Sequence, residues 1–195
     1  MGTREHGFTL WEVMMAVVVA GIVLGLAVPS FQEFQRSNAM AAAANDLVSG
    51  TLLARSEAVK RQVPVTLCIT ADPSAEVPVC AADPGGGFVV FVDEAGGGNA
   101  AVDGTDTVLL RSAAPGGRIT VSMDHHVVTY GPNGFPRPAF ATRFLFCDDR
   151  GPRTEVGGRA AARVMLIDPT GRGTIRSDAE TVQAVIAGLD AECGE

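Results

Sequence analysis

The chain has 195 residues, of which 47% are hydrophobic and 19% are charged. This leaves room for one domain with an appendage, and it excludes disordered and collagen-like chains. The formal net charge of −7 argues against a protein that coats nucleic acid. The mean hydropathy of +0.22 is high for a wholly soluble domain, and the excess lies in one N-terminal stretch.

That stretch runs from Val13 to Gln32 without a charged residue, with Glu12 and Glu33 closing it on each side. Twenty helical residues span roughly 30 Å, the thickness of the hydrocarbon core of a bilayer. We interpret the stretch as a retained membrane anchor. A buried core helix is the alternative, and it is disfavoured because so short a chain cannot easily surround this many apolar residues.

A short polar leader precedes the anchor and ends in the sequence GFTLWE, residues 7–12. This run resembles the class III signal of type IV pilins and pseudopilins. The resemblance implies that prepilin peptidase cleaves between Gly7 and Phe8 and that Phe8 is then N-methylated. It also makes Pro29 the residue that kinks the helix.

Glu12 lies at the edge of the apolar segment, where a carboxylate needs a partner or access to water. In the pilin family, the glutamate at this position is thought to meet the N-terminal amine of the neighbouring subunit in the filament. A carboxylate and an ammonium group at low dielectric remove each other's burial penalty. The resemblance therefore gives Glu12 a role in assembly, and the alternative is that its side chain only reaches the lipid headgroups.

The chain is predicted to stay helical to about residue 62. Met40, Ala44, Val48 and Leu52 recur at four-residue spacing with polar residues on the other faces, which predicts an apolar stripe that packs on other elements.

Short β-branched runs separated by turn residues follow. We expect strands at 63–70, 88–92, 108–111, 119–123, 127–130, 144–147 and 164–167, with Ile175 in a last hairpin arm. One long helix followed by antiparallel strands is an α+β pattern.

The sequence LLARSEAVKR at 52–61 and the C-terminal hairpin around residues 164–172 resemble the minor-pilin family of FimT, FimU and GspH. The resemblance implies the pilin fold, a long helix with a membrane-spanning half and an amphipathic half packed on an antiparallel sheet. It further implies a cleaved leader at 1–7, a transmembrane or pilus-core helix at 8–35, and a periplasmic domain at 36–195. Within that domain, the amphipathic helix is expected at 36–62 and the β-rich part at 63–195.

The four cysteines contain no Cys-x-x-Cys spacing, which argues against a zinc ribbon or a redox motif. An even number of cysteines in an oxidising periplasm favours disulfides. Three pairings can be drawn, and the resemblance favours Cys68–Cys80 and Cys147–Cys193. Four buried thiols are the alternative.

We find no constellation of catalytic residues in the sequence, and we expect neither an enzyme nor a cofactor. His125 and His126 are adjacent on a predicted strand, so their side chains would point to opposite faces and could not jointly bind a metal.

Residues 143–176 contain seven arginines against four acidic residues, whereas residues 62–142 contain 3 basic and 8 acidic residues. In FimT-type relatives, a C-terminal Gly-Arg-x-Arg element is associated with DNA capture. Here the sequence is GRGTIR at 171–176, with one extra residue before the second arginine. On a strand, Arg172 and Arg176 would share a face about 13 Å apart, within reach of separate phosphates. A surface for docking the next pilin and a solvated arginine face are the alternatives.

The resemblance predicts a minor type IV pilin that takes part in pilus assembly or priming as a structural component. Its expected partners are prepilin peptidase, other minor and major pilins, and the inner membrane, which it spans once with the C-terminal domain in the periplasm before it joins a pilus or pseudopilus. The alternatives are a minor pilin that binds double-stranded DNA for uptake and a GspH-like pseudopilin of type II secretion.

Overall fold

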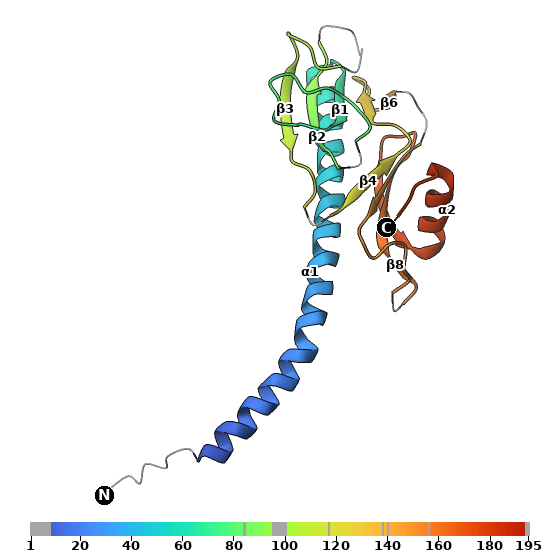
Figure 1. Cartoon of the computed structure of the whole chain (residues 1–195). Helices are drawn as coiled ribbons and strands as arrows, with labels where there is room; N and C mark the ends of the chain where they lie inside the picture. Colours follow the sequence, from blue (N-terminus) through green and yellow to red (C-terminus); the bar gives the residue numbers. More distant parts are fainter. Residues whose placement is uncertain are drawn as a thin grey trace, which may run out of the picture. The chain divides into compact units, whose positions relative to one another are not determined.

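The computed structural model describes residues 9–193 except 84, 95–100, 117, 138, 140 and 156. The chain divides into two compact units, Met1–Asn38 and Ala39–Glu195. The elements in chain order are α1 (Leu10–Arg61), β1 (Val65–Thr70), β2 (Gly87–Val92), β3 (Thr107–Ser112), β4 (Thr120–Met123), β5 (Val127–Tyr130), β6 (Pro136–Arg137), β7 (Thr142–Cys147), β8 (Arg159–Ile167), β9 (Gly173–Asp178) and α2 (Ala179–Leu189). Figure 1 shows these elements, and the expected α+β class is confirmed.

Two antiparallel sheets form the larger unit. The first has the strand order β3-β2-β1-β5-β6 and the second β4-β7-β8-β9. In the first sheet, Leu67 of β1 pairs with Val90 of β2 on one side and Val128 of β5 on the other. In the second sheet, β8 pairs with both β7 and β9. The predicted strands are all present, but β6 and α2 were not expected.

The C-terminal half of α1 supplies the centre of the core. Its buried residues are Met40, Ala44, Leu47, Thr51, Ala54 and Ala58, which recur at the 3.6-residue period of a helix. They pack against apolar side chains of both sheets, such as Val90 and Phe144. Gly50 belongs to this contact, because a Cβ there would lie 2.4 Å from Cε2 of Phe88.

The predicted stripe on this helix was partly wrong. Met40 and Ala44 are buried and Val48 is partly buried, but Leu52 is 57% exposed. Each four-residue step advances about 40° beyond a full turn, so Leu52 lies about 120° around the helix from Met40. The stripe therefore leaves the buried face before it reaches Leu52.

Each sheet also has a covered outer face. On the first sheet, Cys68, Val89 and Phe91 pack beneath residues of the connecting loops, including Cys80. On the second, α2 covers β7 and β8 through Val182 and Val185. Figure 1 shows α2 beside β8. No secondary structure was predicted for the segment 179–193, and it is largely a packed helix.

The Arg143 side chain lies between the C-terminal end of α2 and the loop between β4 and β5. The Arg143 guanidinium lies against Gly188 in the last turn of α2, where a Cβ would be 2.6 Å from Nη1. Its Nε donates to Asp124 Oδ2 over 2.8 Å. A cation at this position is favourable, because the C-terminal end of a helix carries a partial negative charge.

A hydrogen bond from β5 to the turn before β9 links the two sheets. The Tyr130 hydroxyl donates to the Gly171 carbonyl over 3.3 Å. Tyr130 is fully buried, and burial raises its pKa to about 12. Gly171 has a φ of +80°, and a Cβ there would lie 2.9 Å from the Tyr130 ring, so this close approach needs a glycine.

Candidate functional site

The predicted processing bond between Gly7 and Phe8 lies outside the described residues. Directly after it, Thr9 and Glu12 cap the start of α1. The backbone N–H and the hydroxyl of Thr9 each donate to Glu12 Oε2 over 3.1 Å, and the Glu12 N–H donates to the Thr9 hydroxyl over 3.3 Å. These reciprocal bonds form a capping box, which satisfies donors that a helix N-terminus leaves without intrahelical partners.

The capping box gives Glu12 a local function that we did not predict. The Thr-x-x-Glu spacing before an apolar run was the sequence signal that could have revealed it. Glu12 is exposed, so its carboxylate is accessible to a cation from another molecule. In the isolated chain, its negative charge also lies at the positive end of the helix dipole, which is favourable.

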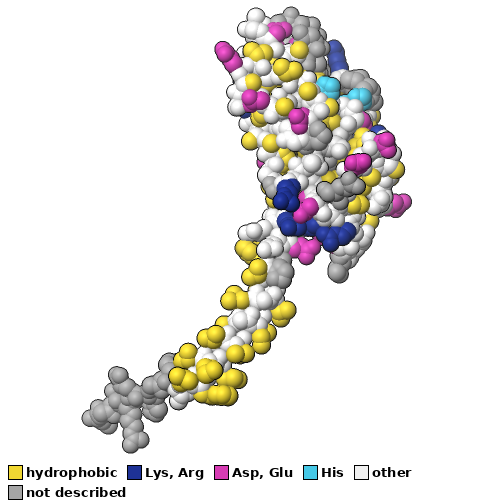
Figure 2. All heavy atoms as spheres, viewed as in Figure 1, with side chains coloured by type: hydrophobic (Ala, Val, Ile, Leu, Met, Phe, Trp, Pro, Cys, Tyr) yellow, Lys and Arg dark blue, Asp and Glu magenta, His cyan; other side chains and the backbone are white. Residues whose placement is uncertain are grey.

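The N-terminal part of α1 exposes apolar side chains around its whole circumference. Fifteen large hydrophobic residues between Leu10 and Phe34 are 48–80% exposed, and Figure 2 shows such side chains along this part of α1. The helix is long and apolar enough to cross a membrane. An apolar surface on every side requires burial in lipid or among other helices. The helix continues through Pro29, whose side chain is outside the description.

The four cysteines form two disulfides, Cys68–Cys80 and Cys147–Cys193. This is the pairing that the family resemblance implied. The first ties β1 to the loop that covers the outer face of its sheet, and the second ties the segment after α2 to the end of β7.

The arginine-rich stretch is divided between structural and exposed positions. Arg150 is 3% exposed, and its Nη2 lies 2.8 Å from Oδ2 of Asp148, whose side chain is 2% exposed. Its Nη1 lies 3.3 Å from Glu155 Oε1. Arg143 pairs with Asp124, as described above. Both arginines are therefore used in packing, which leaves fewer cations on the surface than the sequence count indicated.

Arg172 and Arg176 are both exposed, but the expectation that they share one strand was wrong. Arg172 belongs to the turn before β9, where its N–H donates to Asp168 Oδ1 over 3.1 Å, and Arg176 lies within β9. Hydrogen bonds from Thr170, with a smaller contribution from Arg172, lower the pKa of Asp168. Hydrogen bonds from Thr181, with a smaller contribution from Arg176, lower the pKa of Asp178. Each arginine thus has an ionised carboxylate nearby.

The prediction that His125 and His126 lie on a strand was also wrong, because both fall in the loop between β4 and β5. Within the part of the chain that the structure describes, no three His, Cys, Asp or Glu side chains gather in a way that could hold a metal ion.

Comparisons with known proteins agree with this architecture. The family model described as type II transport protein GspH matches residues 43–173, and the prokaryotic N-terminal methylation motif matches residues 2–28. No curated protein sequence matches the chain.

Two crystal structures of the type IV minor pilin FimU from Pseudomonas aeruginosa are similar to this chain. The first has 23% identity and a TM-score of 0.52, and it covers 75% of this chain and 94% of that one. The second has 20% identity and a TM-score of 0.45, with coverages of 69% and 90%. The first similarity shows the pilin fold. Since the GspH model covers well over half of the sequence, the chain belongs to the family of type II transport protein GspH.

Proposed function

We propose that this chain is a minor type IV pilin that is processed by prepilin peptidase and enters the pilus as a structural component of its assembly or priming complex. The observation that carries the proposal is the exposed apolar helix that starts at Leu10, the third residue after the predicted cleavage bond. Such a helix is stable in lipid before assembly and among other pilin helices afterwards. The function requires no catalytic site and no cofactor.

The proposal places the chain in the inner membrane as a single-pass protein, with residues 36–195 in the periplasm. The two disulfides support this placement, because an oxidising compartment lets them persist. Prepilin peptidase would remove residues 1–7 and leave Phe8 as a methylated cation. The processed chain would then join other minor and major pilins.

Glu12 would change partners during assembly. Before assembly, its carboxylate accepts hydrogen bonds from Thr9. In the filament, it would instead face the methylated amine of a neighbouring subunit in an environment without water. An uncompensated buried charge would cost several kcal/mol, so the exchange selects subunits that supply the opposite charge.

Glu12→Val tests this step, with Glu33→Val as the matched control at the other end of the apolar segment. Glu12→Val should still insert into the membrane, since it lengthens the apolar run, but its recovery in sheared pili should fall well below that of the wild type. Glu33→Val should be recovered normally. Equal incorporation of the wild type and Glu12→Val in cross-linked pili would refute the charge-pair argument.

A second function, capture of double-stranded DNA, is supported by the exposure of Arg172 and Arg176. Two phosphate contacts would make the logarithm of the affinity fall with the logarithm of the salt concentration at a slope of roughly −2. Arg172→Ala combined with Arg176→Ala should then abolish that slope without changing the melting temperature. If instead the chain binds no DNA at low salt and the double variant loses pilus assembly, the arginines belong to a protein interface.

A pseudopilin of type II secretion remains the alternative structural role, because it shares the same signal and the same family. Deleting the chain separates the two roles. Loss of surface pili with normal protein secretion supports the pilus assignment, and the reverse result supports the secretion assignment.

A further inference from the structure

The connection between β7 and β8 ends in a short hairpin that begins with an arginine. The Ala161 N–H donates to the Arg153 carbonyl over 2.9 Å. An isolated antiparallel bridge pairs Thr154 with Ala160 in the next position. Residues that are directly opposite in an antiparallel pair share a face. The Arg153 side chain therefore lies on the same face of the hairpin as Ala161.

The start of β8 adds two arginines to this face. The β8 residues that pack in the cluster beneath α2 are Ala160, Ala162 and Val164. Side chains alternate along a strand, so Arg159, Ala161 and Arg163 point to the opposite side. Arg153 is then a diagonal neighbour of both arginines, at a spacing of about 7–8 Å. We call Arg153, Arg159 and Arg163, which surround the small Ala161 side chain, the arginine face.

The carboxylates nearest to the arginine face already have other partners. Glu155 is the only acidic residue in the sequence between Arg153 and Arg163, and its Oε1 lies 3.3 Å from Nη1 of the buried Arg150. Asp178 of β9 pairs with the Arg159 backbone position, but its carboxylate caps α2. The arginine face therefore has a surplus of positive charge.

The electrostatics of Arg163 agree with this surplus. Burial and, to a smaller extent, the positive charge of Arg159 lower the pKa of Arg163, while Glu155 opposes the shift. Arg153 and Arg159 are exposed and Arg163 is half-buried. The three guanidinium groups can thus meet an anion from outside the chain without any rearrangement of the sheet.

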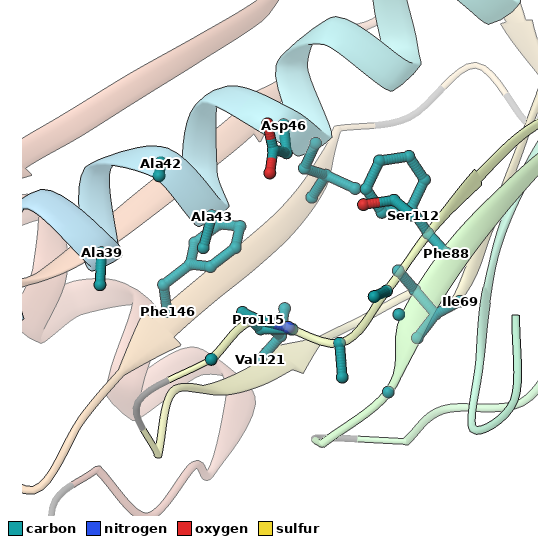
Figure 3. A pocket seen from close by; sticks show the side chains of 16 residues that line it. Ala39, Ala42, Ala43, Asp46, Ile69, Phe88, Ser112, Pro115, Val121 and Phe146 are labelled. Atoms are coloured by element: carbon teal, nitrogen blue, oxygen red, sulfur yellow. The ribbon is translucent and has the colours of Figure 1, made fainter.

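The arginine face lies at the end of the larger unit where α1 enters it. Arg163 pairs with Phe146 of β7. Phe146 lines a cleft together with Ala39 and Ala43 of α1, and Figure 3 shows Phe146 beside Ala43. Ala39 is the first residue of the larger unit, so Arg163 lies near the point where α1 continues into the apolar anchor.

The other end of β8 is near a later part of α1. Ile167 pairs with Gly173, where a Cβ would lie 3.5 Å from Thr51 Oγ1. The strand thus runs from the Ala39 end of the helix toward Thr51. Arg159, which precedes Arg163 by four residues, lies up to about 13 Å farther toward the anchor end.

The chain connection keeps this end of the larger unit close to the membrane surface. Ala39 follows Gln32, the last residue of the uncharged run, by seven positions. The helix α1 is continuous across them, so they span about 10 Å. This is close to the Debye length of about 8 Å at physiological ionic strength, within which charges attract each other effectively.

We propose that the arginine face binds the phosphate groups of anionic phospholipids at the periplasmic surface of the inner membrane before the chain enters a filament. Guanidinium groups suit this role, because they bind phosphate oxygens in bidentate geometry. Each arginine near an anionic bilayer favours the bound position about fivefold. The inference rests on the proposed function, which places the larger unit in the periplasm beside the membrane.

Energy transfer in lipid nanodiscs tests the contact with the full chain. A donor dye on Thr154→Cys, attached after the disulfides have formed, reports to an acceptor dye on the lipid headgroups. Transfer should be higher in discs of equal parts phosphatidylglycerol and phosphatidylcholine than in discs of phosphatidylcholine alone. High salt should remove the difference, because it screens the charges. A donor on Thr170→Cys, in the turn at the other end of β8, should show a smaller difference.

Charge removal provides the second measurement. Arg153→Ala combined with Arg159→Ala should lower the ratio of docked to free chains in the anionic discs roughly 25-fold, from two contacts of about fivefold each. Lys60→Ala combined with Arg61→Ala is the matched control, because it removes two exposed cations at the far end of α1. Circular dichroism checks the fold of each variant, and Arg159→Glu decides the question if the Arg153 change unfolds the hairpin.

The outcomes separate this inference from the proposed function. Chains that insert into the discs but give equal transfer in both lipid compositions would overturn the lipid contact alone. A difference that survives Arg159→Glu, or that is lost equally in the Lys60 and Arg61 control, would overturn it as well. Failure of the chain to insert through its apolar helix would instead refute the membrane anchoring on which the proposed function depends.

Discussion

Replacing Arg150 by Ala should strongly destabilise the larger unit. The Arg150 Nε donates to both carboxylate oxygens of Asp148, over 3.2 and 2.9 Å, and both side chains are almost fully buried. Removing the guanidinium leaves the Asp148 carboxylate buried without its cation. Breaking a buried ion pair in this way costs about 3–5 kcal/mol.

Thermal unfolding followed by circular dichroism measures the effect. A loss of 1 kcal/mol shifts the melting temperature by about 2–4 °C in a domain of this size, so the expected decrease is roughly 6–20 °C. Arg172→Ala is the matched control, because Arg172 is exposed and surface substitutions usually stay within about 0.5 kcal/mol. If Arg150→Ala melted like the control, the division of the arginines into structural and surface groups would be wrong.

Two further predictions concern the packing of the larger unit. Tyr130 is the one tyrosine of the chain, and its tyrosinate absorbance should titrate near pH 12 in the folded state and near pH 10 after unfolding. The free energy of unfolding in urea should therefore fall as the pH rises above 10, because the unfolded chain loses the proton first. A titration midpoint near pH 10 in the folded state would contradict the burial of Tyr130. Cys193→Ser should lower the unfolding free energy in urea by about 4 kcal/mol, since the Cys147–Cys193 disulfide closes a loop with a sequence separation of 46. The same substitution should make α2 an early site of limited proteolysis. Unchanged stability and unchanged protection of α2 would argue against a stabilising role of this disulfide.

The long helix and the strand order along the chain could be predicted from the sequence because both depend on local patterns. The uncharged run from Val13 to Gln32 and the β-branched runs after residue 63 are such patterns. The apolar residues of α2 also have helical spacing, because Val182, Val185 and Ile186 are at positions i, i+3 and i+4. The sequence analysis predicted strands only in this half of the chain and did not use that spacing.

Whether an individual charged side chain is buried or exposed could not be predicted from the sequence. Arg150 and Arg172 are separated by only 22 positions, yet one is buried against Asp148 and the other is exposed. Burial depends on which loop or sheet face covers a residue, which is a long-range property of the fold. Leu52 is a different case, because its exposure follows from the 40° advance of each four-residue step around the helix, which the predicted stripe did not take into account.

The N-terminus of the mature chain tests the pilin assignment most directly. The full chain should be produced with and without prepilin peptidase, and the intact mass and N-terminal sequence of the membrane fraction should be determined. The account predicts a chain that begins at N-methylated Phe8 only when the peptidase is present, and a Gly7→Leu variant that keeps its leader. A mature chain that begins beyond Ser30, or an uncleaved chain in the presence of active peptidase, would contradict the assignment.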